Sequence, residues 1–340
     1  MREYFFIAVV AAVLTYGTTP GVRRLAVLLG AATPVRARDV HTHPIPRLGG
    51  LAMLVGFLGA VLVTLVGAID DVRELDWLTK LAGQIIAAGA MAFFGVQLLS
   101  VPLFGVTVLP GPVLVGLTVL IVLVTTNAVN FIDGLDGLAA GIVAIAALAF
   151  FLYVYQLSYT YDPPNVISTA TFITAATLGV CLGFLPHNFN PARLFMGDAG
   201  ALLLGLLLAA ATVSMVGNID PSAQVTPNAQ VALYLPVVLP LAIMSIPLLD
   251  MTLAIIRRTR RGQRPWHPDA QHLQHRMLQL GHSHRGAVLL LYLWAAIIAF
   301  GATSFAFVDG PLPVVAIAAG VLAAILLTAR LPKWLRRHRL

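Results

Sequence analysis

Charged residues are scarce in this sequence, and so is cysteine. Only 10% of the 340 residues are charged, 59% are hydrophobic, and the mean hydropathy is +0.90. So little polar side chain cannot cover the surface of a soluble globule, which excludes that class of protein. The single cysteine, Cys181, excludes an intrachain disulfide and a cysteine-based metal site. The chain is therefore expected to be solvated by lipid.

Apolar runs of about 17 to 25 residues recur along the chain, and each could cross a hydrocarbon core of about 30 Å as a helix. Helices satisfy their own backbone inside lipid, so the sequence predicts an all-α, polytopic membrane helical bundle. We expect ten helices, over residues 3–19, 49–69, 78–96, 111–131, 137–157, 167–186, 199–216, 229–256, 286–307 and 311–330. The first is interpreted as a retained helix because Arg23 and Arg24, not a small-residue cleavage site, follow it. Residues 1–340 then form one integral membrane domain.

Basic residues are unevenly distributed between these runs. They cluster in 23–47, 73–80, around Arg193, in 257–285 and in the tail, whereas 97–110, 158–166, 217–228 and 308–310 contain no lysine or arginine. The positive-inside rule places the basic connections in the cytoplasm, together with every polar motif described below. The segment 257–285 is expected to be a cytoplasmic loop rich in histidine and arginine.

One stretch breaks this alternation of sides. The connections 23–47 and 73–80 should both be cytoplasmic, yet only the run 49–69 separates them. A run of about 22 residues rises about 33 Å, enough for one crossing and not two. A re-entrant hairpin, an outward loop 23–47 or a lost span would each explain this. We favour the lost span, which puts loop 23–47 on the face opposite Asp71 and predicts low activity.

The first polar constellation is the adjacent pair Asp70 and Asp71, followed by Lys80 and Gln84. Two neighbouring carboxylates at a membrane helix end repel each other unless a cation or a proton holds them. A solvated helix terminus is the simpler alternative. A pair followed by a lysine favours a functional site.

The second constellation lies in residues 127–138, where Asn127, Asn130 and Asp133 recur every third position. Neighbours at this spacing share a helix face and could line one cavity. Gly134 and Gly137 are expected to loosen the last turn, so that backbone amides or carboxylates can approach a phosphate or a cation. Asparagines that join helices by hydrogen bonds are the structural alternative.

The third constellation spans residues 187–200 and ends in Asp198, which is flanked by glycines at the start of an expected helix. Mg²⁺ binds one or two carboxylates together with substrate phosphate oxygens, and Asp198 could offer one of them. A simple helix cap is the alternative.

The fourth constellation comprises residues 267–276 and 281–285, which are rich in histidine and arginine. Such side chains can bind a diphosphate by charge-assisted hydrogen bonds. A zinc site is the competing interpretation, but no cysteine accompanies the histidines and their spacing fits no common finger. An amphipathic loop on anionic lipid is the structural alternative.

The four blocks, in this order across residues 36–286, resemble the polyprenyl-phosphate N-acetylhexosamine-1-phosphate transferases. The loop form His-Leu-x-His-Arg followed by Leu-Gly-His-Ser is similar to the bacterial undecaprenyl- or decaprenyl-phosphate GlcNAc-1-phosphate transferase branch. The resemblance implies transfer of GlcNAc-1-phosphate from UDP-GlcNAc to a membrane polyprenyl phosphate, with release of UMP. This would be the first membrane step of cell-envelope glycan synthesis, at the cytoplasmic face of a bacterial plasma membrane.

The resemblance also implies roles for individual residues. Asp70 and Asp71 would orient or deprotonate the lipid phosphate and Lys80 would hold it, either by direct attack or through a covalent aspartyl intermediate. Mg²⁺, or alternatively Mn²⁺, would be held by Asp198 with Asn130. The remaining implied positions are Asp133 as catalytic and Asn127, Asp136, Asn190, Arg193, His272, His275 and Arg276 as substrate-binding.

Two departures from the family pattern bear on activity. Gln274 replaces the first histidine of a pair in the loop, and one of the family's usual eleven spans is missing before Asp70. The alternatives are therefore a phospho-MurNAc-pentapeptide transferase, a catalytically impaired relative or a membrane transporter. No nucleic-acid partner is expected, and a homodimer is left open.

Overall fold

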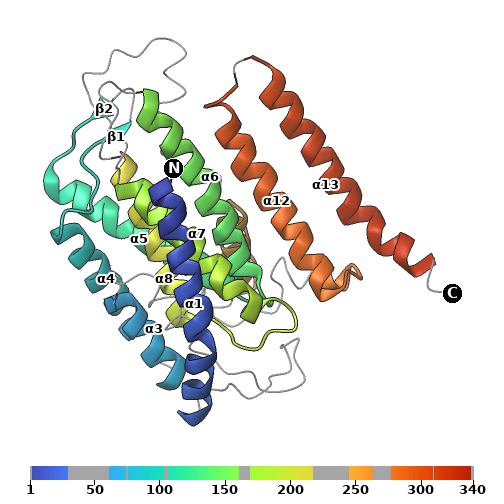
Figure 1. Cartoon of the computed structure of the whole chain (residues 1–340), viewed down its shortest axis with the longest axis horizontal. Coiled ribbons are helices and arrows are strands. Elements are labelled where there is room, and N and C mark those ends of the chain that lie inside the picture. The colour runs from blue at the N-terminus through green and yellow to red at the C-terminus, as the bar shows by residue number, and fades with distance from the viewer. Residues whose placement is uncertain are drawn as a thin grey trace.

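The computed structural model describes residues 2–29, 61–73, 76–102, 106–160, 169–216, 245–262, 277–308 and 310–337. Within these ranges the chain is a bundle of ten α-helices with one pair of two-residue strands (Figure 1). The helices are α1 (Arg2–Leu28), α3 (Val61–Arg73), α4 (Trp77–Phe93), α5 (Gly111–Ile132), α6 (Leu138–Thr160), α7 (Thr169–Asn188), α8 (Gly197–Val216), α10 (Ser245–Arg260), α12 (His284–Ser304) and α13 (Leu312–Arg337). The antiparallel strands β1 (Val101–Pro102) and β2 (Val106–Thr107) lie between α4 and α5.

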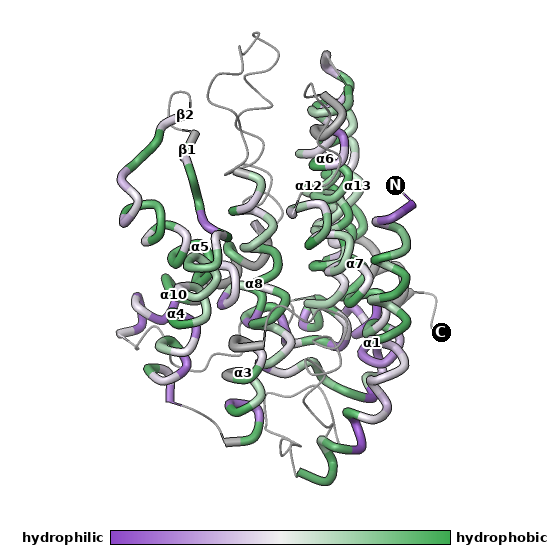
Figure 2. The backbone as a smooth tube through the Cα atoms, turned by 60° about the vertical axis from the view of Figure 1, so that its left-hand side comes forward, coloured by the Kyte–Doolittle hydropathy of each residue, from purple (hydrophilic) through white to green (hydrophobic). Residues whose placement is uncertain are grey.

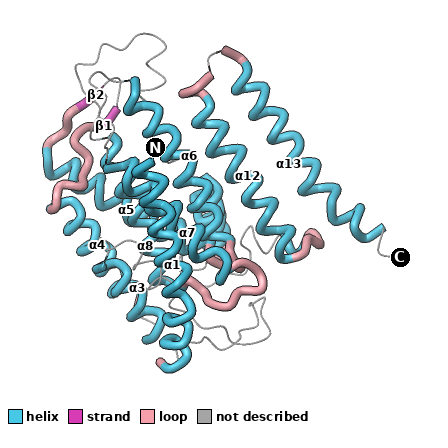
Figure 3. The backbone as a smooth tube through the Cα atoms, viewed as in Figure 1, coloured by secondary structure: helices cyan, strands magenta, loops and turns pink. Residues whose placement is uncertain are grey.

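Seven of the described helices are long and apolar enough to cross a membrane, namely α1, α5, α6, α7, α8, α12 and α13. This confirms the predicted all-α, integral membrane bundle. The expected boundaries agree within a few residues for most helices. Figure 3 shows that helix makes up most of the described part of the chain. Of the predicted segments 49–69 and 229–256, the parts 49–60 and 229–244 lie outside the described residues.

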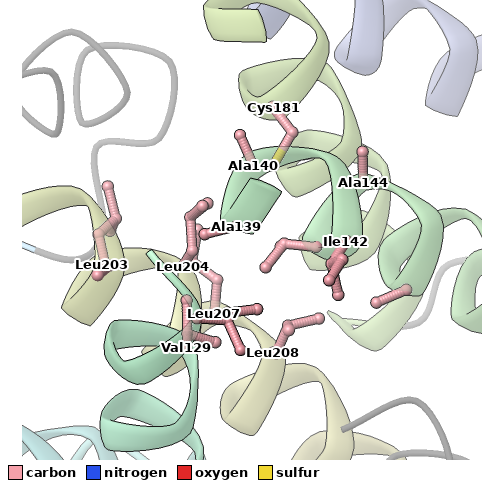
Figure 4. Close-up of a cluster of buried hydrophobic side chains, with 14 of the residues drawn as sticks. Val129, Ala139, Ala140, Ile142, Ala144, Cys181, Leu203, Leu204, Leu207 and Leu208 are labelled. Carbon is pink, nitrogen blue, oxygen red and sulfur yellow. The ribbon is translucent and has the colours of Figure 1, made fainter. Parts of the chain in front are cut away.

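Helix α8 forms the centre of the bundle, where it contacts α3, α5, α6 and α7. In the membrane-spanning part of α8, 83% of the residues are buried, against 11% in α13. A helix that is apolar on every side suits such a central position. Figure 4 shows how the core combines side chains of four helices, with Val129 from α5, Ala139, Ala140, Ile142 and Ala144 from α6, Cys181 from α7, and Leu203, Leu204, Leu207 and Leu208 from α8.

Helices α1 and α7 run parallel and touch through small residues. A Cβ atom at Gly179 would overlap the carbonyl of Ala8, and one at Gly183 would overlap the carbonyl of Ala12. Glycines four residues apart let two membrane helices approach closely enough for backbone contact, which maximises van der Waals packing in lipid. This contact fixes α1 against the core.

Helix α1 continues past its predicted end at residue 19, and a histidine from α7 explains how. Pro20 has no amide hydrogen, so the carbonyl of Tyr16, four residues earlier, lacks its usual helical donor. His187 Nε2 lies 3.2 Å from that carbonyl oxygen, and its ring lies 4.7 Å from the Tyr16 ring. The imidazole N–H replaces the missing backbone donor, and the helix passes through the proline.

The end of α1 lies beside the end of α3. Ala26 is fully buried and packs with Val22 and Ala68, which is two residues before Asp70. The prediction that a lost span puts loop 23–47 opposite Asp71 is therefore wrong for residues 23–29, since they lie at the same end of the bundle. Residues 30–47 lie outside the described part of the chain. Figure 2 shows polar residues gathering at the lower ends of α1, α3 and α4.

Candidate active site

Lys80 joins two aspartates at this polar end of the bundle. Its Nζ atom lies 3.2 Å from Asp70 Oδ2 and also pairs with Asp198 Oδ2. The three side chains come from α4, α3 and α8, and between 14% and 24% of each is exposed. Partly buried ion pairs cost free energy to assemble, so their presence points to function.

Asp198 does not cap its own helix, which removes the structural alternative for this residue. Its Oδ1 accepts a hydrogen bond of 2.9 Å from Asn130 Nδ2, while its Oδ2 pairs with Lys80. The contact with α5 is possible because the two helices approach closely at Gly205, where a Cβ atom would overlap the backbone of Thr126. Both oxygens of Asp198 thus face neighbouring helices at the site.

Asp71 is the residue that caps α8. Its Oδ1 accepts from the amide of Asp198 at 2.9 Å and its Oδ2 from the amide of Ala199 at 3.2 Å. A carboxylate in this position satisfies amides that have no partner within the helix and interacts favourably with the helix dipole. Gly197 has a φ of +66°, and a Cβ atom there would overlap the Asp71 carboxylate. Only glycine suits that position.

Asn127 lies one turn above Asn130 on α5 and bonds to α4. Its Nδ2 donates to Gln84 Oε1 at 2.8 Å and to the carbonyl of Leu123 at 2.7 Å. Gln84 is buried and follows Lys80 by one turn, so this bond aligns α4 with α5. Asn127 therefore joins α4 to α5 by a hydrogen bond, as the structural alternative for the asparagines predicts. Its role as a substrate ligand stays a prediction.

Asp136 and Asn190 form a second network beside the first. Asp136 is 1% exposed, and its Oδ2 accepts from Asn190 Nδ2 and from the amide of Ala192, both at 3.0 Å. Asn188 Oδ1 accepts from the amide of Gly137 at 3.0 Å. These contacts clamp the segment after α7 onto the turn between α5 and α6. Substrate contacts for Asp136 and Asn190 stay predictions.

Helix α12 holds the same turn from the other side. The amide of Asp136 donates to His284 Nε2 at 3.1 Å, and the Tyr292 hydroxyl donates to the carbonyl of Gly137. Arg285 Nε donates to the carbonyl of Asn190 at 2.9 Å. The expectation that amides of this glycine-containing turn are open to a phosphate is thus wrong for residues 136 and 137, because protein groups accept both hydrogens.

Several predicted residues are not joined to the Lys80 cluster by these bonds. The Arg193 side chain is exposed, and its amide donates to the carbonyl of His187 at 2.8 Å. Asp133 is half-buried at the end of α5, three residues after Asn130. His272, His275 and Arg276, like Gln274, lie outside the described residues.

Two positions were missed by reasoning from the sequence. Tyr292 lies within an apolar run, where an aromatic residue carries no sign of a polar role. Arg258 is 4% exposed, with its guanidinium carbon 5.8 Å from the centre of the Phe131 ring. A buried arginine one helix away from the asparagine motif could have been suspected only from its place at the end of an apolar run.

Outside the membrane spans, Asp76 caps α4, the helix that carries Lys80. Its carboxylate accepts from the amides of Leu78 and Thr79 at 3.1 and 3.2 Å and from the Thr79 hydroxyl. The hydroxyl bond, followed by the Thr79 amide bond, lowers the pKa of Asp76 below its ordinary value of 3.8. The exposed carboxylate therefore stays ionised and keeps the first turn of α4 in place.

The donor set fits a hard divalent cation only in part. Among the described residues, no group of three or more histidine, cysteine, aspartate or glutamate side chains could hold a metal ion. Asp70 and Asp198 nevertheless share one positive charge, the Lys80 ammonium, and two carboxylates with substrate phosphates are the donors that Mg²⁺ takes. Asn130 presents its amide nitrogen to Asp198, so in this orientation it supports that carboxylate.

Comparison with known proteins identifies relatives of this chain. Residues 53–218 match the model of "Glycosyl transferase family 4". The chain is 42% identical to a decaprenyl-phosphate N-acetylglucosaminephosphotransferase of Mycolicibacterium smegmatis, over 96% of this chain and 88% of the relative. It is 41% identical to the protein of that name from Mycobacterium tuberculosis, over 90% and 83%. A probable undecaprenyl-phosphate N-acetylglucosaminyl 1-phosphate transferase of Bacillus subtilis is 32% identical, over 81% and 77%.

The first of these alignments also bears on the length of the chain. It extends over 359 residues and takes in 96% of these 340, so this chain lacks a counterpart at about 30 of the aligned positions. One membrane helix needs only about 20 residues. The roughly 30 aligned positions without a counterpart would be enough for one membrane span. The loss of a span before Asp70 stays a prediction. Because Ala26 and Ala68 are in contact, any such loss has left α1 and α3 ending on one side.

Proposed function

This chain belongs to glycosyl transferase family 4, and we propose that it transfers GlcNAc-1-phosphate from UDP-GlcNAc to a membrane polyprenyl phosphate. The products are polyprenyl-diphospho-GlcNAc and UMP. The identity of 42% over 96% of the chain to a decaprenyl-phosphate N-acetylglucosaminephosphotransferase supports the polyprenyl phosphate acceptor and the transferred group. In this proposal the enzyme carries out the first membrane step of a cell-envelope glycan.

The proposed reaction exchanges one phosphorus–oxygen bond for another. An oxygen of the lipid phosphate attacks the β-phosphorus of UDP-GlcNAc, and the bond from that phosphorus to the bridging oxygen breaks. The electron pair leaves on that oxygen, which becomes a terminal phosphate oxygen of UMP. Phosphoryl transfer of this kind depends mainly on positioning and charge neutralisation. A phosphate monoester, with a second pKa of about 6, is largely ionised at neutral pH, so direct attack needs little base catalysis.

The main support is the meeting of Lys80, Asp70 and Asp198 at one end of the bundle. An incoming phosphate competes with the two aspartates for the lysine ammonium. The ammonium can therefore bind the phosphate by charge-assisted hydrogen bonds. We assign Lys80 to the lipid phosphate and Asp70 to its orientation. Asp71 contributes by holding the first turn of α8.

Mg²⁺ is the proposed cofactor, with Mn²⁺ as an alternative. Asp198 would hold the ion, with the diphosphate of the nucleotide sugar supplying further oxygens and Asn130 steadying the carboxylate. When bound, the ion would neutralise charge on the diphosphate. Asp133 remains a proposed catalytic residue. The remaining proposed substrate contacts are Asn127, Asp136, Asn190, Arg193 and the loop residues His272, His275 and Arg276.

The proposed location is a bacterial plasma membrane, with the site on its cytoplasmic face. Arg285 bonds to the segment after α7 and Lys80 lies in the ion cluster, so described basic residues lie at the end of the bundle that carries the site. This agrees with the positive-inside rule. A transporter would need polar groups near mid-membrane, whereas the networks described here lie at helix ends. A homodimer also remains a proposal, for which the exposed apolar face of α13 offers area.

Transfer of label to lipid tests this function. Purified protein in vesicles, given polyprenyl phosphate, Mg²⁺ and UDP-GlcNAc labelled in the sugar, should yield a product that extracts into butanol, and UMP in equal amount. UDP-MurNAc-pentapeptide, offered under the same conditions, should give none. Preference for that substrate would favour the phospho-MurNAc-pentapeptide alternative. Uptake of intact UDP-GlcNAc without lipid product would identify a transporter.

A further inference from the structure

The turn at residues 133–137 is held mainly through its backbone. Asn188 and His284 accept from the amides of Gly137 and Asp136, and the Gly137 carbonyl accepts from the Tyr292 hydroxyl and from the Gly141 amide. Backbone bonds of this kind set the position of a turn without altering the charge of its side chains. The turn begins three residues after Asn130, so its position bears directly on the Asp198 cluster.

Tyr292 can reach the Gly137 carbonyl only because α6 leaves room for its ring. A Cβ atom at Gly141 would overlap both Cζ and Oη of Tyr292. Gly137 itself has a φ of +79°, with the Tyr292 hydroxyl 3.4 Å from an added Cβ atom on one side and Phe189 Cδ2 3.0 Å from it on the other. The two glycines and the tyrosine thus form one fitted contact between α6 and α12, which pack against each other along their length.

We propose that Tyr292 is a positioning residue for the transfer reaction, which it serves by holding the turn that carries Asp133 and Asp136. It acts through the Gly137 carbonyl, to which its hydroxyl donates. The inference rests on the proposed function for its activity measurement. Loss of its hydroxyl leaves the Gly137 carbonyl with the Gly141 amide as donor, so the protein stays folded while the turn gains freedom.

Tyr292→Phe tests this proposal, because it removes the hydroxyl and keeps the ring. We expect kcat to fall about tenfold, with KM for UDP-GlcNAc changed less than about threefold, since misplacement of reacting groups affects the rate more than ground-state binding. Amide hydrogen exchange in the peptide covering residues 133–141 should become faster, and exchange in α1 should not change.

Trp294→Phe is the matched control on the same helix. Trp294 Nε1 donates to Thr328 Oγ1 of α13 at 3.3 Å, so its replacement removes an equivalent bond on the side away from the turn. This variant should keep kcat within about twofold and leave exchange in residues 133–141 unchanged.

Gly141→Ala gives a second, independent test. The added methyl displaces the Tyr292 ring, so kcat should fall at least as far as in Tyr292→Phe. In a Tyr292→Ala background the ring is absent, and Gly141→Ala should then lower kcat by less than about twofold further. Equal losses from Gly141→Ala in both backgrounds would contradict the fitted contact.

Wild-type kcat in Tyr292→Phe would overturn the proposal, and so would a loss of kcat without faster exchange in the turn. Equal losses in Tyr292→Phe and Trp294→Phe would also overturn it, because they would indicate a general packing defect. If the wild-type protein transfers no label, the proposed function fails. The exchange measurement, which needs no substrate, would still decide whether Tyr292 holds the turn.

Discussion

The carboxylate of Asp71 caps the helix that begins beside Asp198, with Oδ1 accepting from the Asp198 amide at 2.9 Å. Adjacent aspartates at residues 70 and 71 therefore differ in what they contact. Asp70 faces the Lys80 ammonium, whereas Asp71 faces the backbone of α8. The cap holds the backbone of Asp198 in place, so Asp71 links α3 to the site through the first turn of α8.

Replacement of Asp71 separates capping from proton transfer. Asp71→Asn keeps one side-chain oxygen as an acceptor for the α8 amides, whereas Asp71→Ala keeps none. We expect Asp71→Asn to retain at least about a tenth of wild-type kcat and Asp71→Ala to lose more, with about 0.5 to 2 kcal/mol of stability lost on removal of the cap. If both variants lost activity equally while thermal unfolding showed Asp71→Asn intact, a proton-transfer role would be the better account.

Asp198→Asn should abolish Mg²⁺-dependent transfer while the protein stays folded. The change withdraws the carboxylate charge that pairs with Lys80, and amide oxygens bind Mg²⁺ more weakly. Label transfer measured against Mg²⁺ concentration, with circular dichroism as the control for folding, checks this. Wild-type turnover with unchanged metal dependence would remove Asp198 from the proposed metal site.

Pro20 and His187 should be energetically coupled. His187→Phe removes the donor that replaces the missing Pro20 amide and should lower the free energy of unfolding by about 0.5 to 1.5 kcal/mol, the usual contribution of one hydrogen bond. Pro20→Ala restores a backbone amide, so His187→Phe should cost clearly less in that background. Thermal unfolding in detergent of the two single variants and the double variant measures the coupling. Additive losses would show that the imidazole does not serve that carbonyl.

The first turn of α4 should become less stable at low pH, because the Asp76 carboxylate caps it. The pKa of Asp76 is lowered in the folded protein, so its contribution is complete well above 3.8 and is lost as the pH falls through the lower folded value. As the pH falls through that lowered pKa, the first turn of α4 should loosen, with faster amide exchange at residues 78 and 79. Asp76→Asn should remove this pH dependence, whereas Glu3→Gln, on α1, should not.

Residues 24 and 283 should be labelled from the same side of the membrane, which we propose is the cytoplasmic side. In a chain with Cys181 replaced by Ala, cysteines introduced by Arg24→Cys and Ser283→Cys should both react with a membrane-impermeant maleimide only after the cytoplasmic face is exposed. Arg24 belongs to the end of α1 that packs on α3, and Ser283 caps α12 beside the turn. Labelling from opposite faces would restore the lost-span topology and predict low activity.

The presence of most helices and the membrane fold could be predicted from the sequence. Apolar runs long enough to cross a membrane have few stable forms there other than a helix. The sequence suggests only that Lys80, Asp198 and Asn130 share a location. Their individual partners could not be predicted, since their bonds connect α3, α4, α5 and α8 across up to 127 positions. The cap by Asp71 and the Tyr292 hydroxyl bond depend on how helices pack. Residue types alone do not determine that packing, and a tyrosine in an apolar run carries no local signal.

The parallel contact between α1 and α7 has a consequence during synthesis. The ribosome makes 171 further residues between Tyr16 and His187. At about 5 to 20 residues per second, α1 waits about 10 to 30 seconds in the bilayer before its glycine-lined partner is translated. Throughout that delay the Tyr16 carbonyl has no imidazole to meet it, and Ala8 and Ala12 face lipid or the translocation machinery. Helix α1 is thus made long before its partner α7, and until α7 is made its residence in the membrane depends on its own hydrophobicity.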